Sequence, residues 1–280
     1  MRKLAFSIKG FNNRKILMDI THTNGESKGL IIFVHGFKGF KDWGTHSLVA
    51  EYFASRGYTF LKFNFSHNGT TIADPLQFVD LEAFGQNTFS MELFELNAVI
   101  DYCFSGKGFE LPKRIMLLGH SKGGGISILQ AARDSRVSHL ITWAATINFS
   151  HLWKGQDIDE WRKSGVRYVE NARTHQQMPQ YVEILEDYEQ NQKALNIEEK
   201  ASQVEQPWLI VHGTEDKAVS INRAERLKQL QPQAQLLIVE GADHVFQARH
   251  PYKEPELPSM LRDVCQSCIQ FLNENELKLK

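Results

Sequence analysis

One serine of this chain lies in a glycine-rich turn that could make its hydroxyl a nucleophile. Residues 119–123 have the sequence Gly-His-Ser-Lys-Gly, so Ser121 has a glycine two positions away on each side. Residues 114–118 form a short apolar run that predicts a buried strand, and residues 126–133 have the pattern of a helix. Glycines leave room for the backbone at so sharp a corner. We therefore expect the Ser121 hydroxyl to project above a sheet edge, beside a helix N-terminus.

An acid and a histidine follow Ser121 along the chain, each just after an apolar run. Residues 207–213 and 236–240 predict two further buried strands, and Asp216 and His244 come after them. Because the carboxyl ends of parallel strands meet at one edge of a sheet, we expect all three side chains to lie at that edge. The histidine could then take the serine proton while the aspartate holds the imidazole, which is the chemistry of acyl transfer.

Acyl transfer also needs N–H donors for the oxyanion that forms. Residues 30–34 predict a continuous apolar strand that ends in His35, Gly36 and Phe37. The loop after such an early strand normally supplies one donor. We predict an oxyanion hole made by the backbone N–H groups of Phe37 and Lys122. We interpret His35 as a structural histidine that braces this loop.

With these segments in view, the chain resembles the α/β-hydrolases, in which the triad has the order Ser, Asp, His. It is similar to the group of dienelactone-hydrolase-like, feruloyl-esterase-like and acylaminoacyl-peptidase-like serine hydrolases. The resemblance is carried by residues 35–37, 119–124, 212–216 and 241–244. It implies that Ser121, Asp216 and His244 are catalytic, because it aligns Asp216 with the acid position. Glu215 and Asp243 are the competing acids.

Lys122 departs from the relatives, many of which have Gln, Met, Tyr or Ala after the nucleophile. As a cation in the first turn of the helix after Ser121 it would oppose the helix dipole. We favour a side chain that reaches solvent. The alternative is that it meets an anionic substrate or a carboxylate such as Glu186.

The residues and the resemblance together predict a serine hydrolase that cleaves carboxylic esters of a small molecule through an acyl-enzyme. An acyl-peptide or prolyl-type peptidase is one alternative. Thioesterase, lipase and carbon–carbon hydrolase chemistry are others, because they use the same triad. A catalytically silent binding protein with the hydrolase fold is a further alternative, although an intact triad argues against it.

The apolar runs alternate with helical segments, as an α/β fold with a mostly parallel sheet requires. We predict a single domain over residues 1–280 with eight strands flanked by helices. An antiparallel hairpin of residues 4–8 and 15–20 is expected at the sheet edge. The other strands are expected at residues 30–34, 58–65, 114–118, 139–144, 207–213 and 236–240.

One polar and aromatic segment interrupts the alternation, at residues 148–203. It occupies the cap position of the hydrolases that the chain resembles. We expect it to cover the substrate pocket, with Trp153, Trp161 and Tyr181 as candidate binding residues. Residues 166–170 and 180–184 suggest a small β-hairpin within it, followed by an acidic helix.

Composition excludes several classes of protein. The formal net charge is −1 and the sequence pI about 6.8, which argues against nucleic acid as a partner. Eleven histidines are scattered without metal-ligand spacing, so we expect no metal and no cofactor. The sequence does not indicate an oligomeric state.

The three cysteines do not suggest a disulfide framework. We expect Cys265 and Cys268 to be half-buried in a helix over residues 260–272, and Cys103 to pack in the core. No apolar run is long enough for a membrane span, and the N-terminus lacks the apolar stretch of a signal peptide. A cytoplasmic location is therefore the expectation.

Overall fold

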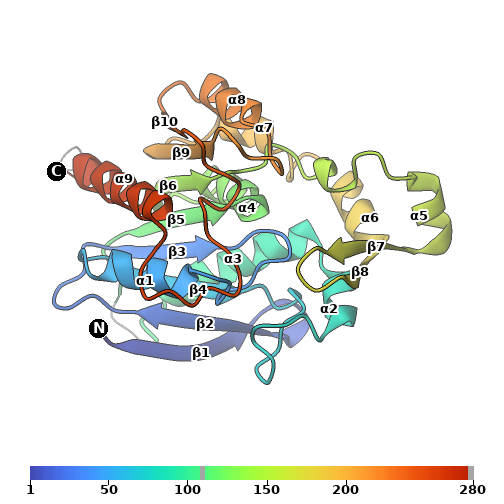
Figure 1. Ribbon diagram of the computed structural model, residues 1–280, viewed down its shortest axis with the longest axis horizontal. Helices are drawn as coiled ribbons and strands as arrows, with labels where there is room; N and C mark the ends of the chain where they lie inside the picture. Colours follow the sequence, from blue (N-terminus) through green and yellow to red (C-terminus); the bar gives the residue numbers. More distant parts are fainter. Residues whose placement is uncertain (108–110, 277–280) are drawn as a thin grey trace.

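A central sheet of eight strands organises the computed structural model, which describes residues 1–107 and 111–276 (Figure 1). Its spatial order is β1-β2-β4-β3-β5-β6-β9-β10. The β1–β2 and β2–β4 pairs are antiparallel, and all other neighbouring pairs are parallel. The strands are β1 (Lys3–Lys9), β2 (Lys15–Thr21), β3 (Leu30–Val34), β4 (Thr59–Asn64), β5 (Ile115–His120), β6 (Val137–Trp143), β9 (Trp208–Gly213) and β10 (Gln235–Val239). The predicted mostly parallel sheet is confirmed.

Helices cover both faces of this sheet, which explains the unbroken apolar runs of its central strands. Along β3, Ile31 and Phe33 pack on the face with α1 and α9, whereas Leu30, Ile32 and Val34 pack on the face with α3, α4 and α8. The helices are α1 (His46–Ala54), α2 (Leu81–Gln86), α3 (Phe89–Cys103), α4 (Lys122–Ala131), α5 (Ile158–Ser164), α6 (Glu183–Gln190), α7 (Ile197–Ala201), α8 (Asn222–Leu230) and α9 (Ser259–Glu276).

The sheet begins with the expected edge hairpin of β1 and β2. Every second residue of β1 is exposed, as expected of an edge strand with one face on the core. Between the strands the chain turns through the short 3-10 helix η1 (Phe11–Asn13), where Asn12 and Asn13 both have positive φ. Asparagine is among the residues that tolerate this conformation.

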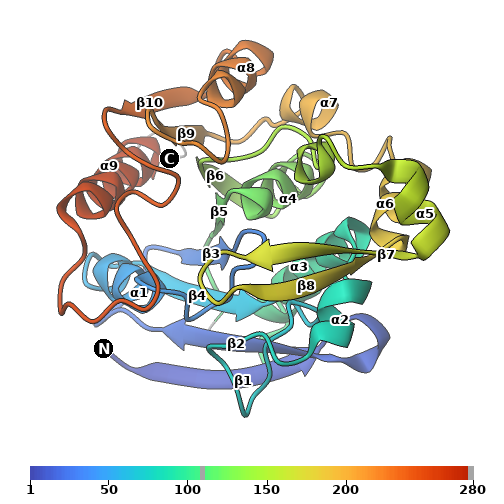
Figure 2. The ribbon, with the colours of Figure 1, turned by 45° about the vertical axis from the view of Figure 1, so that its right-hand side comes forward.

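The segment between β6 and β9 forms a separate layer beside the main sheet (Figure 2). It contains the 3-10 helix η2 (Ser150–Trp153), α5, the antiparallel pair β7 (Val166–Asn171) and β8 (Gln176–Tyr181), α6 and α7. The predicted hairpin is present, but its second strand lies four residues earlier than expected. Residues from Glu183 onward instead form α6, because Ile184 and Leu185 pack into the main core.

The cysteines are all buried and free. Cys265 and Cys268 lie on α9, as expected, but they are fully buried rather than half-buried, because this face of the helix packs against the sheet. Burial raises the pKa of the Cys268 thiol to about 12. Within the described residues, no helix combines the length and apolar character needed to cross a bilayer.

Candidate active site

Ser121 joins β5 to α4 in a backbone conformation that non-glycine residues rarely adopt, with φ 57° and ψ −120°. The flanking glycines are required by close packing. A Cβ atom on Gly119 would lie 2.4 Å from the carbonyl oxygen of Gly123, and one on Gly123 would lie 2.2 Å from that of Val34. The corner is therefore pressed against β3, and it is the strained strand-to-helix turn that the sequence predicts.

Asp216 and His244, from the loops after β9 and β10, form a hydrogen-bonded pair. The Nδ1 atom of His244 lies 2.7 Å from Oδ2 of Asp216. The other oxygen, Oδ1, accepts the backbone N–H groups of Ala218 and Val219, each at 2.8 Å. Burial alone would raise the pKa of Asp216, but hydrogen bonds from His212 and His244 lower it below its usual value. The acid is therefore ionised at neutral pH.

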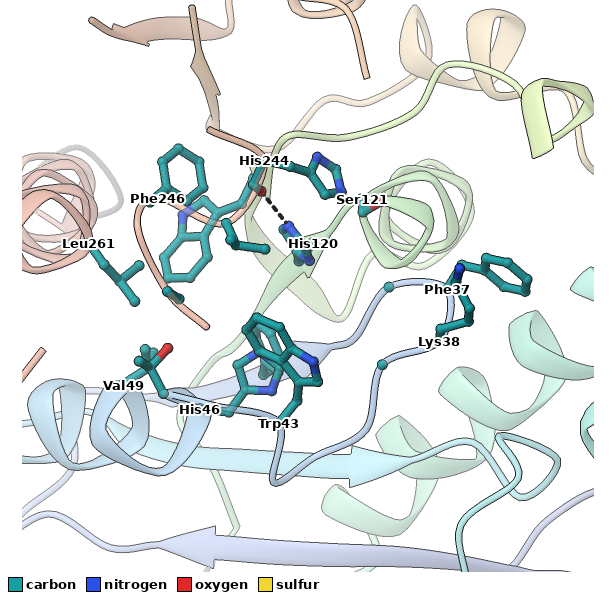
Figure 3. A pocket seen from close by; sticks show the side chains of 17 residues that line it. Phe37, Lys38, Trp43, His46, Val49, His120, Ser121, His244, Phe246 and Leu261 are labelled. Carbon is teal, nitrogen blue, oxygen red and sulfur yellow. Dashed lines mark hydrogen bonds between the residues drawn. The ribbon is translucent and has the colours of Figure 1, made fainter. Parts of the chain in front are cut away.

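His244 and Ser121 line the same cavity, and the His244 ring lies beside the serine (Figure 3). Because an ionised carboxylate only accepts hydrogen bonds, Nδ1 of His244 carries the proton of that pair. In the neutral ring the Nε2 atom is then unprotonated and available as a base. The structure thus brings together the three residues that the sequence places after three different strands.

The two competing carboxylates do not contact His244 through a hydrogen bond that the described residues show. Asp243 accepts the backbone N–H groups of Val245 and Gln247 at 3.1 and 2.9 Å, so it caps the turn that carries His244. Glu215 is exposed. Of these three neighbouring carboxylates, Asp216 is the one that is hydrogen-bonded to the imidazole.

The two predicted oxyanion donors belong to different segments, the loop after β3 and the first turn of α4. The N–H of Lys122 is the first of α4, and a first N–H has no acceptor within its own helix. Phe37 lies in the loop after β3, and no acceptor for its N–H is found among the described residues. His35 braces this loop, with Nδ1 2.9 Å from the Gly36 carbonyl oxygen and Nε2 3.4 Å from the Phe65 nitrogen.

The expectation that Lys122 reaches solvent is wrong. Its side chain is 5% exposed and forms an ion pair with Glu92 of α3, whose side chain is 1% exposed. The ammonium also lies 5.5 Å from the centre of the Phe65 ring. Asn87 donates a hydrogen bond to the same carboxylate at 2.8 Å, and Glu186 is not the partner. The charge is therefore neutralised inside the protein.

The cavity in front of Ser121 has a volume of about 220 Å³ and lies on the side of α1 and α9. Its walls are largely apolar and aromatic, and His46 and His120 add two imidazoles. The apolar walls are Phe33, Trp43, Val49, Trp143, Phe246 and Leu261. Burial lowers the pKa of both His46 and His120 to about 3, so both rings are neutral at pH 7.

The three aromatic residues proposed from the 148–203 segment do not reach this cavity. Trp153 and Trp161 are buried in the core beside α3, with ring centres 5.9 Å apart. Tyr181 donates a hydrogen bond to Glu82 of α2 at 2.5 Å. These aromatic side chains anchor the segment to the domain, and in the described residues none of positions 148–203 lines the main cavity. The segment instead contacts the loop after β3, where Lys38 Nζ donates to the Glu170 carbonyl oxygen at 2.9 Å.

Three histidines at the site were not predicted from the sequence. His120 donates Nε2–H to the carbonyl oxygen of His244 at 2.9 Å, which fixes the backbone of His244. His46 lines the cavity, and His212 contacts Asp216. His120 and His212 lie at the ends of β5 and β9, and this position was the signal that could have found them. Among the described residues, no group of three or more His, Cys, Asp or Glu could hold a metal.

Comparison with known proteins agrees with this geometry. Over 233 residues the chain is 27% identical to the biotin biosynthesis bifunctional protein BioHC of Cellvibrio japonicus (strain Ueda107), covering 72% of this chain and 44% of that protein. Over 113 residues it is 28% identical to the quorum-quenching protein AidA of Acinetobacter baumannii (strain MDR-ZJ06), covering 40% and 34%. The matches thus span less than half the length of these curated relatives.

Solved structures share the fold over nearly the whole chain. Est1E from Butyrivibrio proteoclasticus, solved with ferulic acid bound, matches with a TM-score of 0.73 at 21% identity, over 96% of this chain and 98% of that one. The model of a family described as the alpha/beta hydrolase family matches residues 31–254. This match includes the elbow, the acid and the histidine, and the chain therefore belongs to the alpha/beta hydrolase family.

Proposed function

We propose that this protein is a serine hydrolase that cleaves carboxylic esters through an acyl-enzyme. Family membership supports hydrolase activity. The observation that carries the finer assignment is the 2.7 Å pair of His244 and Asp216 on the cavity that also holds the strained Ser121. A binding protein without catalysis has no need of this arrangement.

In the proposed mechanism His244 accepts the Ser121 proton as the hydroxyl attacks the ester carbonyl. Asp216 holds the imidazole tautomer and stabilises the imidazolium that forms. The N–H groups of Phe37 and Lys122 bind the oxyanion, a contribution of about 2.7–4 kcal/mol for a single donor. His244 then protonates the leaving alcohol, and water releases the acid by the same steps.

The cavity favours a compact, apolar, uncharged group next to the scissile bond. Its walls are mainly aromatic and aliphatic, and its two additional imidazoles are neutral. Its one lining lysine among the described residues, Lys38, donates its ammonium to the Glu170 carbonyl oxygen. The positive charge of Lys122, which could have attracted an anionic substrate, is paired with Glu92. We therefore expect esters of neutral acyl groups to be turned over faster than those of anionic acyl groups.

Steady-state hydrolysis of p-nitrophenyl acetate, butyrate and hemisuccinate tests this proposal. Ser121→Ala and His244→Gln should lower kcat/KM by at least about 10⁴-fold, because the triad acts as a unit. Ser220→Ala, at an exposed serine, is the control and should behave like the wild type. Turnover that persists in Ser121→Ala would contradict the mechanism. Faster turnover of a butyryl thioester or an acylaminoacyl p-nitroanilide would replace the ester class with the corresponding alternative.

A further inference from the structure

His212 is a buried histidine that contacts the same carboxylate oxygen of Asp216 as His244 does. It lies on β9 and is fully buried. Its Nε2 atom is 2.8 Å from the carbonyl oxygen of Val219 and 3.3 Å from Oδ2 of Asp216. Both neighbours are acceptors, so Nε2 carries a hydrogen, with the Val219 carbonyl as the nearer acceptor and Oδ2 of Asp216 as the more distant one. No partner for Nδ1 is found in the part of the chain that the structure describes.

The two oxygens of the Asp216 carboxylate have different partners. Oδ1 is held by the turn itself, through the N–H groups of Ala218 and Val219. Oδ2 receives His244 at 2.7 Å and His212 at the longer distance of 3.3 Å. His212 also binds the Val219 carbonyl. The same N–H of β9 therefore lies against both the Asp216 carboxylate and the last residue of the turn 216–219 that carries this carboxylate.

We propose that His212 is a positioning residue for the acid: it holds Oδ2 of Asp216 in line with His244 and withdraws part of its negative charge from His244. This inference rests on the proposed serine-hydrolase function. Removing the His212 donor would leave Oδ2 of Asp216 with His244 as its remaining side-chain partner. The remaining negative charge would be offered to His244 alone, which would make His244 a stronger base.

Other titratable groups also face His244, and they belong to other elements. His120 at the end of β5 and His151 of η2 both interact electrostatically with His244. Burial lowers the pKa of each of these two histidines, which disfavours their charged forms. A change at His212 therefore acts on His244 through Asp216, which is the ionised neighbour.

Three variants separate positioning from general packing. His212→Met removes the donor at similar volume, and His212→Gln retains an N–H donor. His139→Met is the matched control, because His139 is a buried histidine of the neighbouring strand β6 that contacts Ser138 and not the site. We expect His212→Met to lower kcat by about 10–100-fold at unchanged KM, the usual cost of a misplaced catalytic group. His212→Gln should recover most of this loss, and His139→Met should keep the wild-type kcat.

The pH profile gives a readout that a purely structural role would leave unchanged. In His212→Met the acidic limb of kcat/KM should move to higher pH by about half a unit or more, the effect of a weak hydrogen bond. His212→Gln and His139→Met should keep the wild-type limb. A His212→Met enzyme with wild-type kcat and limb would overturn the proposal, and so would a His212→Gln enzyme as impaired as His212→Met.

A measurement on the wild type does not depend on whether the variants fold. In protein labelled with ¹⁵N-histidine, NMR at pH 7 should show a proton on Nε2 of His212 that is protected from exchange. The Nδ1–H tautomer, in which Nε2 has no proton to donate, would overturn the proposal. This result does not require activity, whereas failure of the serine mechanism has its own signature, namely full turnover by Ser121→Ala.

Discussion

Lys122 places a buried positive charge directly after the proposed nucleophile. Its backbone N–H is a proposed oxyanion donor, while its side chain pairs with Glu92 of α3. Two charges removed from water in this way are stable only together, because breaking a buried pair leaves one charge without compensation. The side chain thus ties the N-terminus of α4, and with it the proposed oxyanion donor, to a neighbouring helix.

A single and a double variant test the role of this ion pair. Lys122→Met should lower the free energy of unfolding by about 3–5 kcal/mol, because it leaves the Glu92 carboxylate buried without its cation. The double variant Lys122→Met/Glu92→Leu should recover most of that loss. Urea unfolding measures both. A single variant as stable as the wild type, or a double variant no more stable than the single one, would contradict the buried pair.

At the scale of elements, the corner between β5 and α4 depends on contacts with β3. Gly123 lies so close to β3 that any side chain would strike the backbone, since a Cβ atom would be 2.2 Å from the Val34 carbonyl oxygen. Backbone cannot move aside as a flexible side chain can. The packing of α4 on the sheet and the shape of the site are therefore set by the same glycine.

Substituting this glycine should be costly. We expect Gly123→Ala to lower the free energy of unfolding by about 3 kcal/mol or more, the upper range for overpacking. Gly25→Ala is the control, because a Cβ atom there meets nothing within 4 Å and only the positive φ of 85° is unfavourable. Its cost should be about 1–2 kcal/mol. Equal losses for the two variants in urea unfolding would show that packing against β3 is not the cause.

The elements differ in how far the sequence predicts them. A strand such as Leu30–Val34 is buried on both faces, so its apolar run identifies it locally, and glycine spacing identifies the corner at Ser121. The ion pair of Lys122 with Glu92 joins residues 30 positions apart, and no local pattern reveals such a partner. The same holds for Trp153 and Trp161, which pack in the core beside α3 and not at the cavity. The aromatic residues of an insertion indicate that their side chains are buried, but they do not indicate which surface these side chains pack against.

At the scale of the whole molecule, buried neutral histidines link stability to pH. Burial lowers the pKa of His35, His46 and His120 to about 3, and that of His67 and His139 to about 4, from an ordinary value of 6.5. Below pH 6.5 the unfolded chain therefore binds protons that the folded chain does not. The contribution of these neutral histidines to the free energy of unfolding is fully present above pH 6.5. It is lost as the pH falls from 6.5 towards their pKa values in the folded state.

The free energy of unfolding should accordingly decrease as soon as the pH falls below about 6.5. The three most strongly shifted histidines alone should remove about 4 kcal/mol of unfolding free energy per pH unit once the unfolded chain is protonated at all three. Urea unfolding at pH 8, 7, 6 and 5 measures this slope. The exposed His175, replaced by Gln, should leave the slope unchanged. A free energy of unfolding that stays constant from pH 7 to pH 5 would contradict neutral burial.

The most direct test of the central claim is the position of a covalent adduct. A fluorophosphonate reacts with a serine only when a base and an oxyanion hole activate it. Intact mass followed by peptide mapping should show one adduct per chain, on Ser121, in the wild type and none in Ser121→Ala. An adduct on another residue, or no adduct on folded wild-type protein, would contradict the assignment of Ser121, His244 and Asp216 as the catalytic groups.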